Sequence, residues 1–292
     1  MDTPQALIDA YSRWQQAGRP GQVESRWNKD AWSHRLPKYA EIIGEFPADK
    51  VGRNRGPELI GKVEGGNEAV RAFLLAMVWG YGPVGYGPFR TMRILEAPHA
   101  SERLLEVAHV AQTEGGLAAF QHVATKRKSD SSYLKFLGPA FGTKFLYFVT
   151  APIAAVETGP VMDAVVARWF RKNVPGAGIS VSGWDGESYT SYLEHLRTWS
   201  KSLVQLGEAP LRLDEVEFLI FAGGADFKRN SEWTEQWTSE TPLPAADLLD
   251  RLRALLSVQG NPEGRAAQLI DELEVTLESE RDTDDDQEAA YV

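Results

Sequence analysis

The chain of 292 residues contains no cysteine. Disulfides, thiolate zinc sites and iron–sulfur clusters held by cysteine are therefore excluded. Its five histidines form no metal-ligand spacing, so we expect no catalytic metal. No apolar run is long enough to span a membrane, since the most apolar one, 145–156, is short and contains Pro152. The N-terminus has no basic stretch followed by an apolar block, and we therefore expect a cytoplasmic protein without a secretory signal.

The composition is that of a globular protein that can bury a full core. Nine Trp, nine Tyr and twelve Phe are present, and 43% of the residues are hydrophobic. Apolar residues recur at three- and four-residue spacings over 5–17, 67–79, 101–111, 187–205, 213–222 and 244–258, which predicts helices there. The stretch 178–183 is the only candidate strand. The sequence thus predicts a mostly α protein, with long irregular loops over 18–66, 80–98 and 223–243.

The charge is unevenly distributed along the chain. Of the net charge of −10, residues 271–292 contribute −9, from ten acids and one Arg, which leaves −1 for the rest. Basic residues gather at 126–128, Lys135 and Lys144, and a local basic patch of this kind binds phosphates. We expect an all-α body over 1–260, a C-terminal helix over 261–280 and a solvated acidic tail over 281–292.

The stretch LGPAFGTKFLYF, residues 137–148, places two glycines and a proline between apolar runs. It predicts a helix–hairpin–helix at about 129–149, with a short first helix that GPAFG breaks and a second that starts at TKFLYFV. Gly138 and Gly142 are expected where φ is positive or where two backbones approach closely. Outward-pointing amides at the hairpin form an anion site, which assigns phosphate contacts to Gly138, Ala140, Gly142, Thr143 and Lys135. The alternative is a plain αα corner.

The segment after the hairpin places Asp163 at the start of an amphipathic helix, 19 residues beyond Lys144. The sequences Phe141-Gly142-Thr143-Lys144 and Pro160-Val161-Met162-Asp163 resemble the helix-hairpin-helix DNA glycosylases of the 8-oxoguanine glycosylase type. Residues 125–175 carry this resemblance. The chain departs from the family pattern in its Leu-Gly-Pro order, in Phe145-Leu146 after the lysine and in the additional Met162. The resemblance implies the family's all-α fold without a large β domain.

The resemblance also implies chemistry on duplex DNA that contains a modified base. The base is flipped out of the stack, Lys144 attacks the sugar, and Asp163 stabilises the positive charge that develops as the glycosidic bond breaks. A Schiff base on the lysine would add strand-nicking lyase activity. For each residue alone the simpler hypothesis is structural, a phosphate contact for Lys144 and a helix cap for Asp163. The pair at this spacing behind a hairpin favours catalysis. No cofactor and no obligate protein partner are expected, apart from a structural monovalent cation held by hairpin carbonyls.

Aromatic and basic residues in other loops supply further candidates. In the stretch 79–91, WGYGPVGYGPFRT, we assign Trp79, Tyr81 and Tyr86 to the base pocket or to a loop that enters DNA, and Arg90 to a phosphate or orphan-base contact. A rigid loop packed on the core is the alternative.

Two further stretches complete the candidates. Phe227 and Lys228 follow a predicted helix where this enzyme type holds base-pocket residues. The basic, glycine-flanked sequence GRNRG, 52–56, is a candidate for contact with the DNA backbone, and we favour the alternative of a plain solvated loop.

Three functions follow from these patterns. The first is a DNA glycosylase, either for anti-phage defence against glucosylated hydroxymethylcytosine, which we favour, or for repair of 8-oxoguanine. The second is a helix-hairpin-helix module that binds DNA without catalysis, and the third is a helical interaction protein.

Overall fold

The computed structural model describes residues 2–83, 85–204 and 210–224, all of which belong to one unit, residues 1–237. The predicted helix 244–258, the C-terminal helix 261–280, the tail 281–292 and the candidates Phe227 and Lys228 lie outside the described residues. The helices are α1 (Gln5–Gln16), α2 (Lys29–Arg35), η1 (Pro37–Tyr39), α3 (Ala40–Gly44), α4 (Arg55–Glu58), α5 (Gly66–Tyr81), α6 (Tyr86–Leu95), α7 (Ala100–Glu114), α8 (Gly116–Ser129), α9 (Pro139–Thr150), α10 (Ala164–Asn173), α11 (Gly186–Ser202) and α12 (Leu213–Gly224).

The two strands found in the described part form a minimal antiparallel pair. β1 (Ser25–Arg26) pairs with β2 (Lys50–Val51), so that Ser25 faces Val51. The predicted strand at 178–183 is wrong, because this stretch has no regular structure. The prediction of a mostly α fold without a large β domain is confirmed over the described residues.

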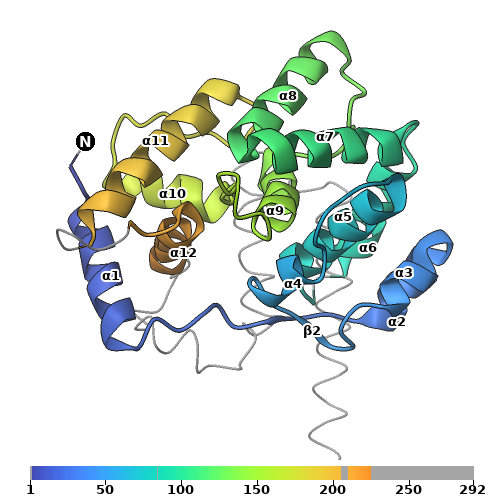
Figure 1. The fold of residues 1–292 in the computed structure, drawn as a ribbon, viewed down its shortest axis with the longest axis horizontal. Coiled ribbons are helices and arrows are strands. Elements are labelled where there is room, and N and C mark those ends of the chain that lie inside the picture. Colours follow the sequence, from blue (N-terminus) through green and yellow to red (C-terminus); the bar gives the residue numbers. More distant parts are fainter. Residues whose placement is uncertain (1, 84, 205–209, 225–292) are drawn as a thin grey trace, which may run out of the picture. The chain divides into compact units, whose positions relative to one another are not determined.

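The core is built around α5 and α9, which are apolar on nearly every side. Residues 142–150 of α9 are all buried, as are residues 72–79 of α5. A helix that is hydrophobic all round is stable only inside a protein, and α9 packs against α5, α7 and α8 (Figure 1). Phe73 and Phe145 meet edge to face across the α5–α9 contact, with ring centroids 5.7 Å apart.

A second group of helices completes the described unit. α12 packs against α1, α10 and α11, and α11 also contacts α8 of the first group (Figure 1). The chain leaves α9 at Thr150 and enters α10 at Ala164, so the segment 151–163 leads from one group to the other. Lys144 on α9 and Asp163 before α10 therefore lie where the two groups meet.

Two of the predicted loops contain regular structure. The range 18–66 carries β1, α2, η1, α3, β2 and α4, and the range 80–98 is occupied largely by α6. In α6, Pro88 is the third residue, where the missing N–H breaks no intrahelical bond. Its buried residues Thr91, Ile94 and Leu95 lie at helical spacings. Glycine and proline in this stretch therefore mark a helix start and not a loop.

Candidate active site

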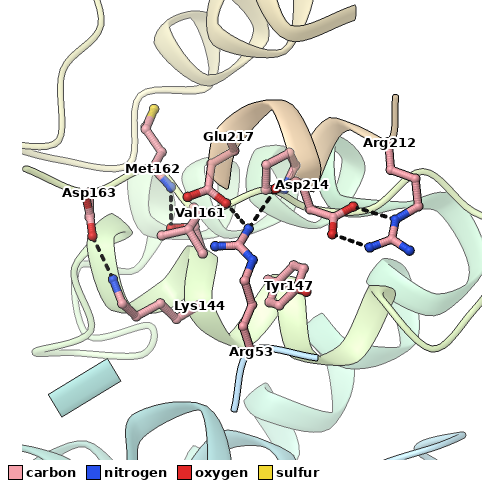
Figure 2. Close-up of polar contacts among 12 residues, drawn as sticks. Arg53, Lys144, Tyr147, Val161, Met162, Asp163, Arg212, Asp214 and Glu217 are labelled. Carbon is pink, nitrogen blue, oxygen red and sulfur yellow. Dashed lines mark hydrogen bonds and ion pairs between the residues drawn. The ribbon is translucent and has the colours of Figure 1, made fainter. Parts of the chain in front are cut away.

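Lys144 and Asp163 form an ion pair at the meeting point of α9 and α10. The Lys144 Nζ atom donates to Asp163 Oδ2 at 3.0 Å, and both side chains are largely buried (Figure 2). Lys144 is the sixth residue of α9 and is followed by the buried residues Phe, Leu, Tyr and Phe, so little solvent surrounds its side chain. The ammonium also lies 5.9 Å from the ring centre of Trp79 and 5.4 Å from that of Phe141.

Asp163 uses its two carboxylate oxygens for different partners. Oδ1 accepts hydrogen bonds from the backbone N–H groups of Val165 at 2.9 Å and Val166 at 3.2 Å, which caps α10. Oδ2 remains for Lys144. Both interpretations of this residue, helix cap and partner of the lysine, therefore hold at once, and the cap fixes the direction in which the free oxygen points.

The additional residue Met162 has a structural role in this geometry. Its side chain is fully buried, and its backbone N–H donates to the Thr143 hydroxyl at 3.0 Å. The Thr143 hydroxyl in turn donates to the Pro139 carbonyl at 2.8 Å. This chain of bonds ties the segment before α10 to the first turn of α9, and so holds Asp163 opposite Lys144.

The electrostatic environment keeps Asp163 ionised. Burial acts to raise the pKa of its carboxyl, but the Lys144 ammonium and the hydrogen bonds from Val165 and Val166 outweigh burial and lower the pKa below its ordinary value of 3.8. Asp163 is thus a carboxylate at neutral pH, set to receive a proton or to stabilise a nearby positive charge.

A cavity of about 170 Å³ opens beside the ion pair. It gathers residues from six separate segments, among them Gln22, Trp79, Gly80, Lys144, Asp163 and Glu217. Three buried polar atoms of these residues have no hydrogen-bond partner: Gln22 Oε1, Trp79 Nε1 and Glu217 Oε1. Buried polar groups are nearly always paired, so three orphaned atoms on residues that line one cavity indicate a site that is completed by a ligand.

Gly80 makes room for the lysine. A Cβ atom at Gly80 would lie 2.6 Å from Lys144 Cδ and 3.1 Å from the Phe141 ring. Only a glycine in α5 lets the Lys144 side chain pass along this helix toward Asp163.

Glu217 on α12 is fully buried and pairs with Arg53, which is also buried (Figure 2). Arg53 donates a second bond to the Asp214 carbonyl at 3.0 Å, and its guanidinium lies 4.7 Å from the Tyr147 ring centre. The interpretation of GRNRG as a solvated loop is therefore wrong for Arg53. Burial raises the pKa of the Glu217 carboxyl, while the Arg53 charge opposes this shift.

The comparison with protein families agrees with this geometry. Residues 18–221 match the family model described as "Putative 8-oxoguanine DNA glycosylase OGG-like protein". The chain belongs to this OGG-like family. The match extends from before Gln22 to beyond Glu217, and so includes every segment of the cavity named above. No curated protein and no solved structure matches the chain.

Membership of the OGG-like family confirms the resemblance found in the sequence. Membership supports a function of the DNA glycosylase type, and the family implies that the substrate is DNA. Within the described ranges no helix is long and apolar enough to cross a membrane, and no three His, Asp or Glu side chains are grouped so that they hold a metal.

The hairpin of this OGG-like protein differs from the predicted one. Its first helix, α8, ends at Ser129, and 131–136 form turns in place of the predicted short helix, because Leu134 and Phe136 have positive φ angles of 46° and 71°. The second helix begins at Pro139, so Ala140, Gly142 and Thr143 lie inside α9.

Neither hairpin glycine has a positive φ, contrary to one branch of the prediction. At Gly142 a side chain and not a second backbone approaches closely, because a Cβ there would lie 2.2 Å from the Trp184 ring. Gly138 is exposed, has a φ of −81° and has open space around it, and no side chain caps the helix that follows. The start of α9 at Gly138 and Ala140 is thus open to an anion, whereas Gly142 and Thr143 are buried.

The predicted basic cluster is not one continuous surface. Lys126 pairs with Glu106 at 2.8 Å, and Lys144 is buried at the site. Arg127 donates to the carbonyls of Leu134 at 3.3 Å and Leu137 at 2.9 Å, which are hairpin carbonyls of the kind expected to hold a monovalent cation. The cation itself stays a prediction. Lys135 is exposed at the turn and remains available for phosphate.

The aromatic candidates separate into buried and exposed ones. Trp79 lines the cavity, and Tyr81 is half-buried and stacks on Phe141 with centroids 4.0 Å apart. Tyr86 is 56% exposed at the start of α6, with Arg90 over its ring at 5.6 Å. The structure therefore brings Trp79 to Lys144 and leaves Tyr86 and Arg90 on the surface.

Sequence reasoning missed the cavity residues Gln22 and Glu217, and it singled out the loop of Arg53 without placing it at the site. All three residues are far from Lys144 in the chain, and the segments of Gln22 and Glu217 carry no motif. The only signal was an acid, Glu217, inside the otherwise apolar stretch VEFLIF.

Proposed function

We propose that this protein is a DNA glycosylase that releases a modified base from duplex DNA, with Lys144 as the nucleophile and Asp163 as its partner. The observation that carries the proposal is the Lys144–Asp163 pair at 3.0 Å on the wall of a cavity with three orphaned polar atoms. Family membership supports the reaction class.

In the proposed reaction the base is flipped into the cavity so that C1′ of its sugar comes to Lys144. As the C1′–N bond stretches, its electron pair leaves with the base, which takes up a proton from water. The ionised Asp163 stabilises the positive charge on the sugar, and then accepts a proton from the Lys144 ammonium as Nζ bonds to C1′. The C1′–O4′ bond then breaks, one proton of the attacking nitrogen passes to O4′, and the opened sugar is held as a protonated Schiff base. The hydroxide left when water protonated the base adds to C1′, the C1′–Nζ bond breaks, and Asp163 returns its proton to the Lys144 amine as the abasic site is released.

The size of the cavity bears on the choice of base. About 170 Å³ is less than the roughly 300–1,000 Å³ of pockets that hold drug-sized ligands, and it suits one nucleobase. We therefore place 8-oxoguanine, the base named in the family description, ahead of glucosylated hydroxymethylcytosine. The role in anti-phage defence stays a prediction, and it is tested by including the glucosylated base.

The test uses duplexes that each carry one base: 8-oxoguanine, uracil, hydroxymethylcytosine, its glucosylated form, or no modification. Base release is scored as abasic sites after alkali, and lyase activity as strand cleavage without alkali. Lys144→Gln and Asp163→Asn are expected to abolish release, while Lys201→Gln, an exposed lysine in the last turn of α11, serves as the matched control. Borohydride added during the reaction should trap the wild-type protein on DNA through Lys144.

The alternative functions give different results in this test. A DNA-binding module would bind the duplexes, release no base and form no trapped adduct. Release that survives Lys144→Gln would assign the attack to water and remove Lys144 from the role of nucleophile.

A further inference from the structure

Glu217 is one of the residues that line the cavity, and it has an unused hydrogen-bond acceptor. The residue is 0% exposed, and only one of its two carboxylate oxygens, Oε2, is bonded, to Arg53. The other, Oε1, has no partner among the described residues, although Glu217 lines the cavity. An unpaired carboxylate oxygen is costly to bury, so its retention beside Lys144 requires a reason.

Arg53 keeps this oxygen in place. Its guanidinium is held by Glu217 and the Asp214 carbonyl, and it lies 5.9 Å from the Trp79 ring centre and 5.7 Å from that of Phe218. A side chain fixed on several sides cannot turn toward another partner. The rigid pair therefore occupies Oε2 and leaves Oε1 as the oxygen of Glu217 that can meet a ligand in the cavity that this residue lines.

The other two orphaned atoms add to the pattern. Gln22 Oε1 is a second acceptor, and Trp79 Nε1 is a donor. The cavity thus offers two acceptors and one donor, and a ligand that satisfies them carries N–H donors together with one carbonyl oxygen.

We propose that Glu217 is a specificity-determining residue that accepts a hydrogen bond from the exocyclic amino group of the flipped base. The site would take amino-bearing bases and reject the counterparts in which that group is missing or replaced by a carbonyl. This inference rests on the proposed glycosylase function. Its physical basis is that a carbonyl oxygen facing Glu217 Oε1 is repelled, and a missing amine leaves a buried acceptor unpaired.

Two matched pairs of bases test the proposal. One is 8-oxoguanine against 8-oxohypoxanthine, which lacks only the 2-amino group, and the other is hydroxymethylcytosine against hydroxymethyluracil. We expect wild-type protein to release the amino-bearing member faster by about a hundredfold or more. In Glu217→Gln the amide can turn its NH₂ to the base, so we expect the preference to fall below about tenfold. Glu194→Gln, an exposed acid on α11, is the matched control.

Two further measurements keep the proposal falsifiable if Glu217→Gln unfolds. Gln22→Leu removes the second acceptor without touching the Arg53 pair, and it should also reduce the preference. Fluorescence anisotropy of Lys144→Gln on the same duplexes should show tighter binding to the amino-bearing member, without any need for turnover.

The outcomes separate the two proposals. If wild-type protein releases both members of each pair equally, or if Lys144→Gln binds them equally, the role of Glu217 is overturned and the glycosylase stands. If no base is released from any duplex, the proposed function fails, and preferential binding of amino-bearing duplexes still decides the role of Glu217.

Discussion

Gly80→Ala is a change that adds one methyl group and touches no reacting atom. The new Cβ would lie 2.6 Å from Lys144 Cδ, closer than such atoms approach in proteins, and 3.2 Å from Lys144 Cε, which is a tight contact. The lysine stem is flexible, so it is displaced while the helices stay in place. The Lys144 amine then moves away from Asp163 by a distance of the order of 1 Å, and a misplacement of this size costs roughly a hundredfold in rate.

The effect on stability should be small by comparison. Alanine is favoured over glycine inside a helix by about 1 kcal/mol, and this gain offsets the contact with the lysine and the Phe141 ring, 3.1 Å from the new atom. We expect the free energy of unfolding to change by less than about 1 kcal/mol. Base release and borohydride trapping under single-turnover conditions measure the rate, and urea denaturation measures the free energy of unfolding.

Two glycines provide the controls for this experiment. In Gly44→Ala the new Cβ has no atom within 4 Å, so the rate and the free energy of unfolding should stay unchanged. Gly142→Ala would place its Cβ 2.2 Å from the Trp184 ring, which cannot bend aside, so it should destabilise the protein by about 1–3 kcal/mol. Full single-turnover activity of a folded Gly80→Ala protein would refute the reasoning, because the position of the Lys144 amine would then be irrelevant to base release.

The remaining predictions concern acidic pH, the loss of the Arg53–Glu217 ion pair and the salt concentration. Since the pKa of Asp163 is lowered below 3.8, its carboxylate contributes to the free energy of unfolding above that pH, and the contribution is lost as the pH falls through the lowered pKa. The difference in free energy of unfolding between wild type and Asp163→Asn, measured by urea denaturation, should therefore shrink between about pH 5 and pH 2. A constant difference would contradict the ion pair. Arg53→Met leaves Glu217 buried without its cation and should destabilise the protein by about 3–5 kcal/mol, and a loss under about 1 kcal/mol would show that the pair is unimportant. Lys135→Gln should lower the salt slope of log affinity for DNA by about 1, measured by anisotropy from low to high salt, and an unchanged slope would exclude a phosphate contact.

The helical body and the Lys144–Asp163 pair were predictable from local sequence. The predicted ranges 67–79 and 187–205 correspond to α5 and α11, because one apolar side at helical spacing is a property of neighbouring residues. The pair was expected from the resemblance to the helix-hairpin-helix glycosylases, which the sequences around Lys144 and Asp163 carry. Lys144 and Asp163 are only 19 residues apart, and the helix that Asp163 caps begins with the next residue, Ala164.

Predictions from local sequence were wrong where glycine, proline or charged residues can have more than one structural role. The helix–hairpin–helix was expected to begin with a short helix at about 129, but the chain turns there through two residues with positive φ, and the helix lies earlier, in α8. The run at 126–128 looked like one phosphate-binding surface, although Glu106 and the hairpin carbonyls bind two of its members. Composition does not specify which partner a charge will find.

By itself the sequence determined a mostly α body, a hairpin followed by a lysine, and a carboxylate at the start of the next helix. Only the tertiary structure decided what surrounds them. Arg53 and Glu217 are 164 residues apart, and each charge is buried because it is paired with the opposite charge of the other residue. No local pattern encodes such a pair, since neither segment would bury a charge alone. The cavity and its three orphaned atoms exist only where six separate segments meet, among them that of Lys144.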